Sequence, residues 1–220
     1  MSKRKSVKIT CPKCKKESDY QIWESINVQI DSDMKEKVLN GEAFLFKCPD
    51  CGEEVYVFYS VLYHDMQKKM MIYLLPDDEK EIKAAAKFMS GTDERTAGLN
   101  LTVISEEYNN RIVTSIRELQ EKIYISDAGY DDRIIEIIKL LYLGMMAEQT
   151  PDKKVDEILF DSGKDGEHRI VFIEGGNVFA SAPVNEEVYN DVQNTFKERI
   201  DNNPNEYFIY DFAWARSLLK

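Results

Sequence analysis

The feature of this chain that most constrains its fold is a pair of matching short motifs, Cys-Pro-x-Cys, which together hold all four of its cysteines. Cys11 and Cys14 form the first motif, Cys48 and Cys51 form the second, and 33 residues separate the two. Two short loops that each supply two thiolates provide the four sulfur ligands of a tetrahedral metal site. The spacing therefore predicts that two turns far apart in the sequence meet at one metal ion.

The residue pattern favours zinc as that ion. Closed sites of four thiolates bind zinc in many proteins. Because such sites leave no coordination position for water, their role is structural and not catalytic. Iron is the alternative, since a rubredoxin also uses two Cys-Pro-x-Cys turns, for electron transfer. The long intervening segment and the lysines of the first turn, Lys13, Lys15 and Lys16, favour zinc. A thioredoxin-like role is disfavoured, because that chemistry uses one cysteine pair between a strand and a helix.

Composition excludes two broad classes of protein. Hydrophobic residues make up 43% of the chain and aromatic residues 11%, which is enough for a folded core and excludes a disordered chain. No apolar run reaches the roughly 20 residues that a membrane helix requires, so no membrane partner is expected. The basic N-terminal residues lead to a short strand and not to an apolar signal core, so we expect a cytoplasmic protein. A reducing compartment also favours metal ligation over disulfides.

Charge is distributed unevenly along the chain. The net charge is −11, but residues 1–17 hold seven cations and one anion, a net +6, which leaves −17 for residues 18–220. One interpretation is a basic segment that contacts nucleic acid. The other is that these cations offset the negative charge of a divalent ion with four thiolates. An acidic body repels phosphate beyond the local patch, so nucleic acid is not the favoured partner.

Periodicity and turn residues predict the elements of the first half of the chain. They are strands at 7–10, 19–30, 43–47, 54–63 and 70–75, helices at 34–39 and 77–89, and a polar connection at 92–100. Gly52 follows the second motif, where a left-handed turn would point backbone amides at the sulfur atoms. Lys15 occupies the equivalent position after the first motif, which makes that turn less typical.

Helix caps and a change of rhythm predict the second half. A capping box at Ser115 and Glu118 begins a helix that ends near Ser126, and Asp131 or Asp132 caps a second helix. That second helix, at 133–148, is apolar around most of its circumference, so we expect it to be buried in the fold or in a homodimer interface. The remaining predicted elements are an antiparallel meander at 158–161, 169–174 and 178–182, a helix at 185–200 capped by Asn185, and a strand at 207–213.

Five further segments accompany the two cysteine turns. They are Tyr63-His64-Asp65, Met71 to Pro76, Arg111-Ile112-Val113, Glu118 to Ile123 and Asp131 to Glu136. In this combination the chain resembles the CpXC family, a bacterial and archaeal family named for its paired cysteine motifs, over roughly residues 7 to 145. The resemblance implies a zinc-ribbon-like metal site at Cys11, Cys14, Cys48 and Cys51. It implies no reaction and no catalytic residues.

His64 and Asp65 are the candidates for catalysis, because histidine transfers protons near neutral pH and an adjacent carboxylate could orient it. The chain has only two histidines, His64 and His168, which excludes a histidine-rich metal centre. The favoured interpretation is a hairpin turn in which Asp65 bonds nearby backbone. A cluster of acidic residues near the start of the second helix could bind a divalent cation, but capping of that helix is the favoured interpretation for Asp127, Asp131, Asp132 and Glu136.

These observations predict an α+β protein in two parts. Residues 1–150 form the CpXC-like region, with a zinc-ribbon-like antiparallel β unit at 1–76 and central helices at 77–150, and residues 151–220 form a small α+β unit. We expect one structural zinc ion, a protein partner and a non-catalytic interaction or scaffold role. The alternatives are a protein that binds nucleic acid through its basic N-terminal segment and a rubredoxin-like iron protein.

Overall fold

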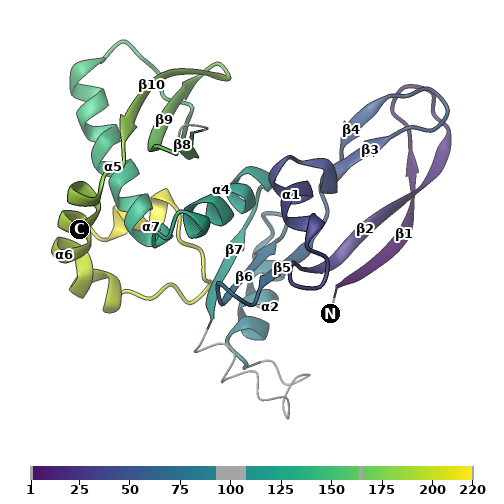
Figure 1. Cartoon of the computed structure of the whole chain (residues 1–220), viewed down its shortest axis with the longest axis horizontal. Helices are drawn as coiled ribbons and strands as arrows, with labels where there is room; N and C mark the ends of the chain where they lie inside the picture. The colour runs from purple at the N-terminus through teal and green to yellow at the C-terminus, as the bar shows by residue number, and fades with distance from the viewer. Residues whose placement is uncertain (1, 93–107, 164–165, 220) are drawn as a thin grey trace. The chain divides into compact units, whose positions relative to one another are not determined.

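The computed structural model describes residues 2–92, 108–163 and 166–219 and shows an α+β protein (Figure 1). The chain divides into two compact units, Met1–Gln120 and Glu121–Lys220. Within the described residues, no helix is long and apolar enough to cross a membrane.

The division between the units falls inside helix α4 (Ile116–Asp127). The sequence analysis divided the chain between residues 150 and 151, a point that lies in the second unit between α5 (Asp132–Gln149) and β8 (Glu157–Ser162). Residues of α5 and β8 pack in the same hydrophobic core, which joins the segments on either side of that point.

The first unit contains a five-stranded sheet with the strand order β1-β2-β5-β6-β7. Its strands are β1 (Lys3–Thr10), β2 (Glu17–Asn27), β5 (Val61–Asp65), β6 (Met70–Leu74) and β7 (Asn109–Val113). The β1–β2 and β5–β6 pairs are antiparallel, as predicted for this region. The β2–β5 and β6–β7 pairs are parallel, so the sheet as a whole is mixed. Parallel neighbours need long connections, and the second hairpin is part of one of them.

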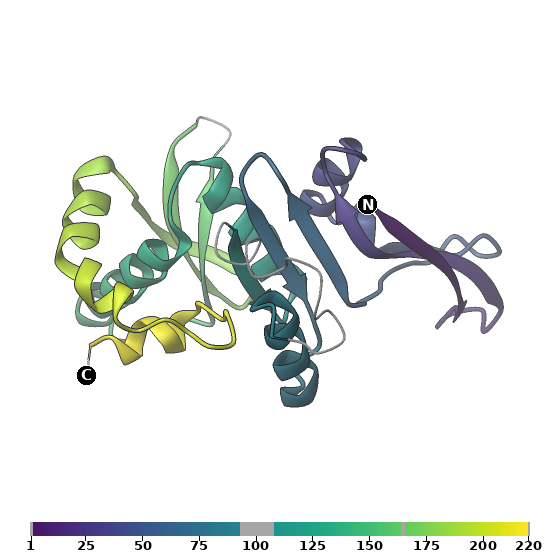
Figure 2. The same cartoon turned by 90° about the horizontal axis from the view of Figure 1, so that it is seen from below.

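That second hairpin consists of β3 (Leu45–Lys47) and β4 (Glu54–Tyr56), which are antiparallel and carry the second cysteine motif at their turn. The turn of β1–β2 carries the first motif, and the two hairpins reach out from the sheet to end side by side (Figures 1 and 2). The predicted strand at 54–63 divides between β4 and β5, because the chain there leaves one sheet and enters the other. At the crossing, the buried Tyr59 donates a hydrogen bond to the carbonyl of Ala43 at 2.6 Å.

Among its described residues, the first unit also contains short helices before residue 93. They are α1 (Asp33–Leu39), the single 3-10 turn η1 (Glu42–Phe44) and α2 (Glu79–Met89), which lies beside the sheet (Figure 2). Strand β7 was not predicted, because Asn109, Asn110 and Arg111 give it a polar pattern. After Thr92, the predicted connection at 92–100 lies outside the described residues.

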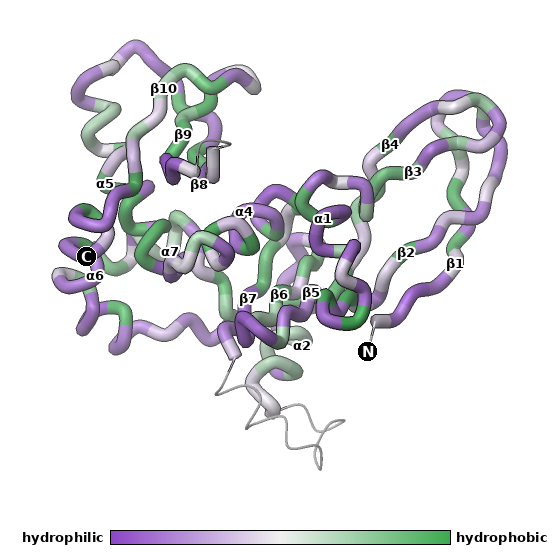
Figure 3. The backbone as a smooth tube through the Cα atoms, in the orientation of Figure 1, coloured by the Kyte–Doolittle hydropathy of each residue, from purple (hydrophilic) through white to green (hydrophobic). Residues whose placement is uncertain are grey.

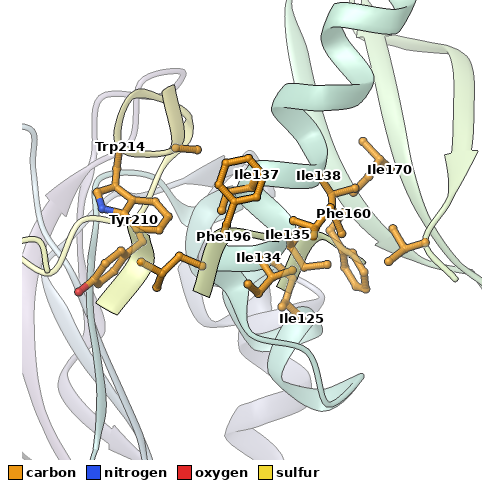
Figure 4. Close-up of a cluster of buried hydrophobic side chains, with 14 of the residues drawn as sticks. Ile125, Ile134, Ile135, Ile137, Ile138, Phe160, Ile170, Phe196, Tyr210 and Trp214 are labelled. Atoms are coloured by element: carbon orange, nitrogen blue, oxygen red, sulfur yellow. The ribbon is translucent and has the colours of Figure 1, made fainter. Parts of the chain in front are cut away.

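The second unit contains the predicted antiparallel meander, in the order β10-β9-β8. Strand β9 (His168–Glu174) lies between β8 and β10 (Asn177–Pro183), and its four consecutive apolar residues are buried (green in Figure 3). Helices α5, α6 (Glu186–Asp201) and α7 (Phe212–Ser217) contribute to the same core. Figure 4 shows the isoleucines of α5 between Tyr210 and Trp214 on one side and Phe160 and Ile170 on the other.

The predicted strand at 207–213 is wrong. Phe208 has a left-handed backbone (φ 56), which interrupts an extended run, and Asp211 caps helix α7 by accepting a hydrogen bond from the Trp214 N–H at 2.8 Å. Of the aromatic residues that suggested a strand, Tyr210 packs in the core of the second unit as a single buried side chain.

The burial predicted for the apolar helix at 133–148 holds for half of its length. The buried positions of α5 end at Lys139. Beyond them, Leu141 is 39% exposed and Met145 is 54% exposed. The homodimer interface suggested for this helix stays a prediction.

Candidate metal centre

The sulfur atoms of the four cysteines gather where the two hairpin turns meet, all within 4.8 Å of one another. The Sγ atoms of Cys11 and Cys51 are 3.6 Å apart, and so are those of Cys14 and Cys48. Zinc–sulfur bonds of about 2.3 Å in a regular tetrahedron place two sulfur atoms about 3.8 Å apart, whereas a disulfide holds them at about 2.05 Å. The four thiols are therefore free, with a spacing compatible with four ligands around one ion.

Both turns have the same backbone geometry. In the first, the N–H of Lys15 donates to the Cys11 carbonyl at 3.0 Å, and the N–H of Cys11 donates to the Lys16 carbonyl at 2.9 Å. The second turn repeats both hydrogen bonds around Cys48, at 2.9 and 2.8 Å, with Gly52 in the place of Lys15. The closing residue is left-handed in both, with φ 63 at Lys15 and φ 73 at Gly52. A lysine thus adopts the conformation for which the sequence pattern favoured glycine.

The two closing residues give a direct test of turn strain. We expect Gly52→Ala to lower the free energy of unfolding by about 1 kcal/mol, because a left-handed backbone costs an L-residue about 1–2 kcal/mol. A Cβ at this position would meet no atom within 4 Å, so the cost is one of backbone alone. Urea denaturation of the metal-loaded protein measures it. The reciprocal variant Lys15→Gly should change stability by less than about 1 kcal/mol, because relief of strain and the added freedom of the unfolded chain oppose each other. A Gly52→Ala protein as stable as the parent would contradict the expectation.

Backbone amides and mutual crowding set the ionisation of the thiols. The N–H of Cys14 lowers the pKa of Cys11 to about 7, against the effect of burial. The N–H of Glu53 also acts to lower the pKa of Cys51, but burial and the neighbouring thiols raise it to about 12. Four thiols at this spacing do not all ionise unless a cation offsets their charge. The site is arranged for a cation and not for one reactive cysteine.

Lysines of the first turn pair with acids of the second. Lys13 Nζ donates to Glu53 Oε2 at 2.9 Å, and Lys16 Nζ pairs with Asp50 in the same way. Other cations of the basic segment pair with acids of the neighbouring strand, namely Lys3 and Lys5 with Glu24 and Lys8 with Asp19. Exposed pairs such as these contribute little stability, but they reduce the positive potential that phosphate would meet.

His64 and Asp65 lie at the end of β5 and are not part of the cysteine cluster. Successive strand residues point to opposite faces, so the Asp65 carboxylate does not orient the imidazole. Asp65 Oδ1 instead accepts from Gln29 Nε2 at 2.9 Å and from the Lys68 N–H at 3.1 Å, as the turn interpretation predicts. Burial lowers the pKa of His64, and its Nδ1 lies 3.4 Å from the Asn27 side-chain nitrogen.

The acidic residues around the start of α5 serve two purposes. Asp131 caps the helix, since its Oδ1 accepts from the Arg133 N–H at 2.9 Å. Asp132 and Glu136 are buried and pair with Lys122. The sequence analysis missed this lysine and its role. Lys122 follows Glu121 in a polar part of α4, so nothing local marked it, whereas Lys139 in α5 is a lysine within a largely apolar helical pattern.

The family model described as CpXC protein matches residues 9–139. This span includes both cysteine turns, the five-stranded sheet from Ile9 onward and the buried first part of α5. No curated protein and no solved structure matches the chain.

Proposed function

The chain belongs to the CpXC family, and from this premise we propose that it is a zinc-binding protein in which one structural zinc ion joins the two cysteine turns. The observation that carries the proposal is the cluster of four sulfur atoms, with two pairs 3.6 Å apart. A closed set of four thiolates leaves no coordination position for water or substrate, so the ion would hold the fold and not catalyse a reaction.

The surroundings of the cluster support a structural role. The hydrophobic core there consists of Cys11, Cys48 and Phe46, and the partly buried residues packed against it include Ile9 and Tyr20. The β3–β4 hairpin has strands of only three residues each. So small a core supplies little folding free energy, and structural metals are one of the usual remedies. A zinc ion would supply the missing free energy directly.

We further propose that the clamped hairpins form a non-catalytic scaffold for another protein in the cytoplasm. Two exposed aromatic residues support a protein partner: Tyr56 is 64% exposed and Phe58 is 43% exposed, both on the segment that follows the second cysteine turn. Aromatic residues of this kind are common anchors in protein interfaces. Nucleic acid is less well supported, because phosphate would have to compete with Glu53 and Asp50 for Lys13 and Lys16.

Metal analysis of protein purified under aerobic and anaerobic conditions tests the proposal first. We expect about one zinc ion per chain and no iron in either preparation, because a closed four-thiolate site of this geometry is filled by one ion. Iron with a visible thiolate absorption band would instead assign the chain to electron transfer. Protein without metal that melts at the same temperature as the loaded protein would remove the structural role.

A further inference from the structure

The second unit contains a buried network of five charged side chains, here called the ion-pair network. Its members are between 3% and 8% exposed: Glu121, Lys122, Asp132, Glu136 and Lys139. Lys122 Nζ lies 3.0 Å from Asp132 Oδ2 and 3.0 Å from Glu136 Oε1. Lys139 Nζ lies 2.8 Å from Glu121 Oε1 and 3.1 Å from Glu136 Oε1. With three acids and two lysines, the network has an excess of one negative charge when every member is ionised.

A cavity of about 270 Å³ adjoins this network, close to the small end of the range for small-molecule sites. Glu136 and Lys139 provide buried charge in its lining. Two further acids, Asp156 and Glu157, also line it. The remaining lining residues are apolar: Leu143, Val155, Ile158 and Phe212. Three carboxylates and one ammonium group therefore line a space whose remaining walls are hydrophobic.

Glu136 is the member of the lining best placed to bind a ligand. Both lysines donate a hydrogen bond to its Oε1, and among the described residues no hydrogen bond is donated to its Oε2. Burial acts to raise the pKa of Glu136, but Lys122 and Lys139 outweigh burial and hold it below its usual range, so the group is charged. Oε2 is not among the buried side-chain atoms that lack a partner, so it is open to water, and Glu136 lines the cavity. A ligand's donor in the cavity would replace that water with a hydrogen bond to a charged group, and such bonds are the stronger ones.

The other charged groups of the lining are engaged within the unit. The ammonium group of Lys139 is shared by Glu121 and Glu136. Asp156 pairs with Lys154 at 2.9 Å and accepts from the Gly175 N–H at 2.8 Å. An anion in this space would face an excess of carboxylates, whereas a cation would be attracted by them.

We propose that this cavity binds a small primary ammonium ligand with a short apolar chain. The ammonium group donates to Glu136 Oε2, and the chain packs against the apolar walls formed by Leu143, Ile158 and Phe212. The site is separate from the cysteine cluster and does not depend on the identity of the metal there.

Binding of n-butylammonium to the full chain, followed by calorimetry or by chemical-shift changes, tests the proposal. We expect saturable binding with a dissociation constant of about 1 mM or tighter. Butan-1-ol has the same chain without the charge and should bind at least about tenfold more weakly, because hydrogen bonds to charged groups are the stronger ones. Butanoate should not bind. No saturation by n-butylammonium up to about 10 mM, as for a cavity that holds water only, would overturn the proposal. So would equal affinity for the alcohol or a preference for the anion.

A matched pair of variants on α5 locates the site. Leu143→Trp should fill the cavity and weaken n-butylammonium binding at least about tenfold. Leu141→Trp places the same side chain on the same helix at an exposed position that does not line the cavity, and it should leave binding unchanged. Glu136→Gln would test the charge directly, but it also breaks buried ion pairs and can unfold the unit. The comparison of Leu143→Trp with Leu141→Trp is therefore the deciding test. Binding that Leu143→Trp leaves intact would contradict the assigned location.

Discussion

Replacing Cys48 by serine is expected to abolish stoichiometric metal binding and to unfold the two hairpins of the first unit. The Cys48 side chain is buried at 1% exposure, and its Sγ lies 3.6 Å from that of Cys14. The variant leaves three thiols and a hydroxyl that binds zinc poorly, so the closed tetrahedral set is lost. Structural zinc contributes an apparent binding free energy of about 10–16 kcal/mol in zinc-finger peptides, far more than a core of this size provides. Metal analysis and thermal melting of the variant measure the effect, and we expect the melting temperature of the first unit to fall by more than about 10 °C.

Two controls separate loss of the metal from damage to the turn. Thr10→Ser alters an exposed residue directly before Cys11 and should leave both metal content and melting unchanged. Removing the metal from the unaltered protein with a chelator should reproduce the melting of Cys48→Ser. The second unit has its own hydrophobic core without a cysteine, so its transition should be the same in all samples. Unchanged melting and unchanged metal content in Cys48→Ser would contradict the proposed clamp.

Local signals predicted the parts of the structure that depend on near neighbours. The capping box is present as expected: the Glu118 N–H donates to Ser115 Oγ at 3.1 Å, and Glu118 Oε2 accepts from the Ser115 N–H at 3.2 Å. Asn185 caps α6 by accepting from the Val188 N–H at 2.9 Å. Such caps involve residues two or three positions apart, so the sequence contains all the information they need. The cysteine cluster could be anticipated for a related reason, because residue type and short spacing define the ligand set.

Features that depend on distant partners could not be predicted from the sequence. Strand β7 exists because Asn109 lies opposite Met70 in a parallel pair, and nothing local marks that pairing. The ion-pair network is a clearer case. Lysine and glutamate on a helix ordinarily indicate a solvated face, and only the fold shows that Lys122, from α4, meets Glu136, from α5, in the core. The cavity beside the network could not be predicted either, because its lining residues come from α5, α7 and the segment that leads into and begins β8.

Lys122→Met is expected to lower the stability of the second unit by about 3–5 kcal/mol, because it leaves buried carboxylates without their cation. Lys122 Nζ lies 3.0 Å from both Asp132 and Glu136, and it also donates to the Tyr210 carbonyl. Methionine keeps an unbranched stem of similar length, so the loss measures the ammonium group and not the packing of the side chain. Thermal unfolding should show a decrease of more than about 10 °C in the melting temperature of the second unit.

The control for this variant is Lys197→Met, which makes the same replacement at an exposed position of α6 and should change stability by less than about 0.5 kcal/mol. If Lys122→Met were as neutral as this control, the Lys122 ammonium group would contribute no net stability, and Lys139 would suffice to compensate the charge of Glu136. If instead Lys122→Met is strongly destabilising, the fold maintains a buried, ionised Glu136 at a considerable free-energy cost. Replacing buried ion pairs by apolar residues of similar volume is often neutral or stabilising. Stability alone therefore does not explain why the fold retains these charges, whereas a binding site does.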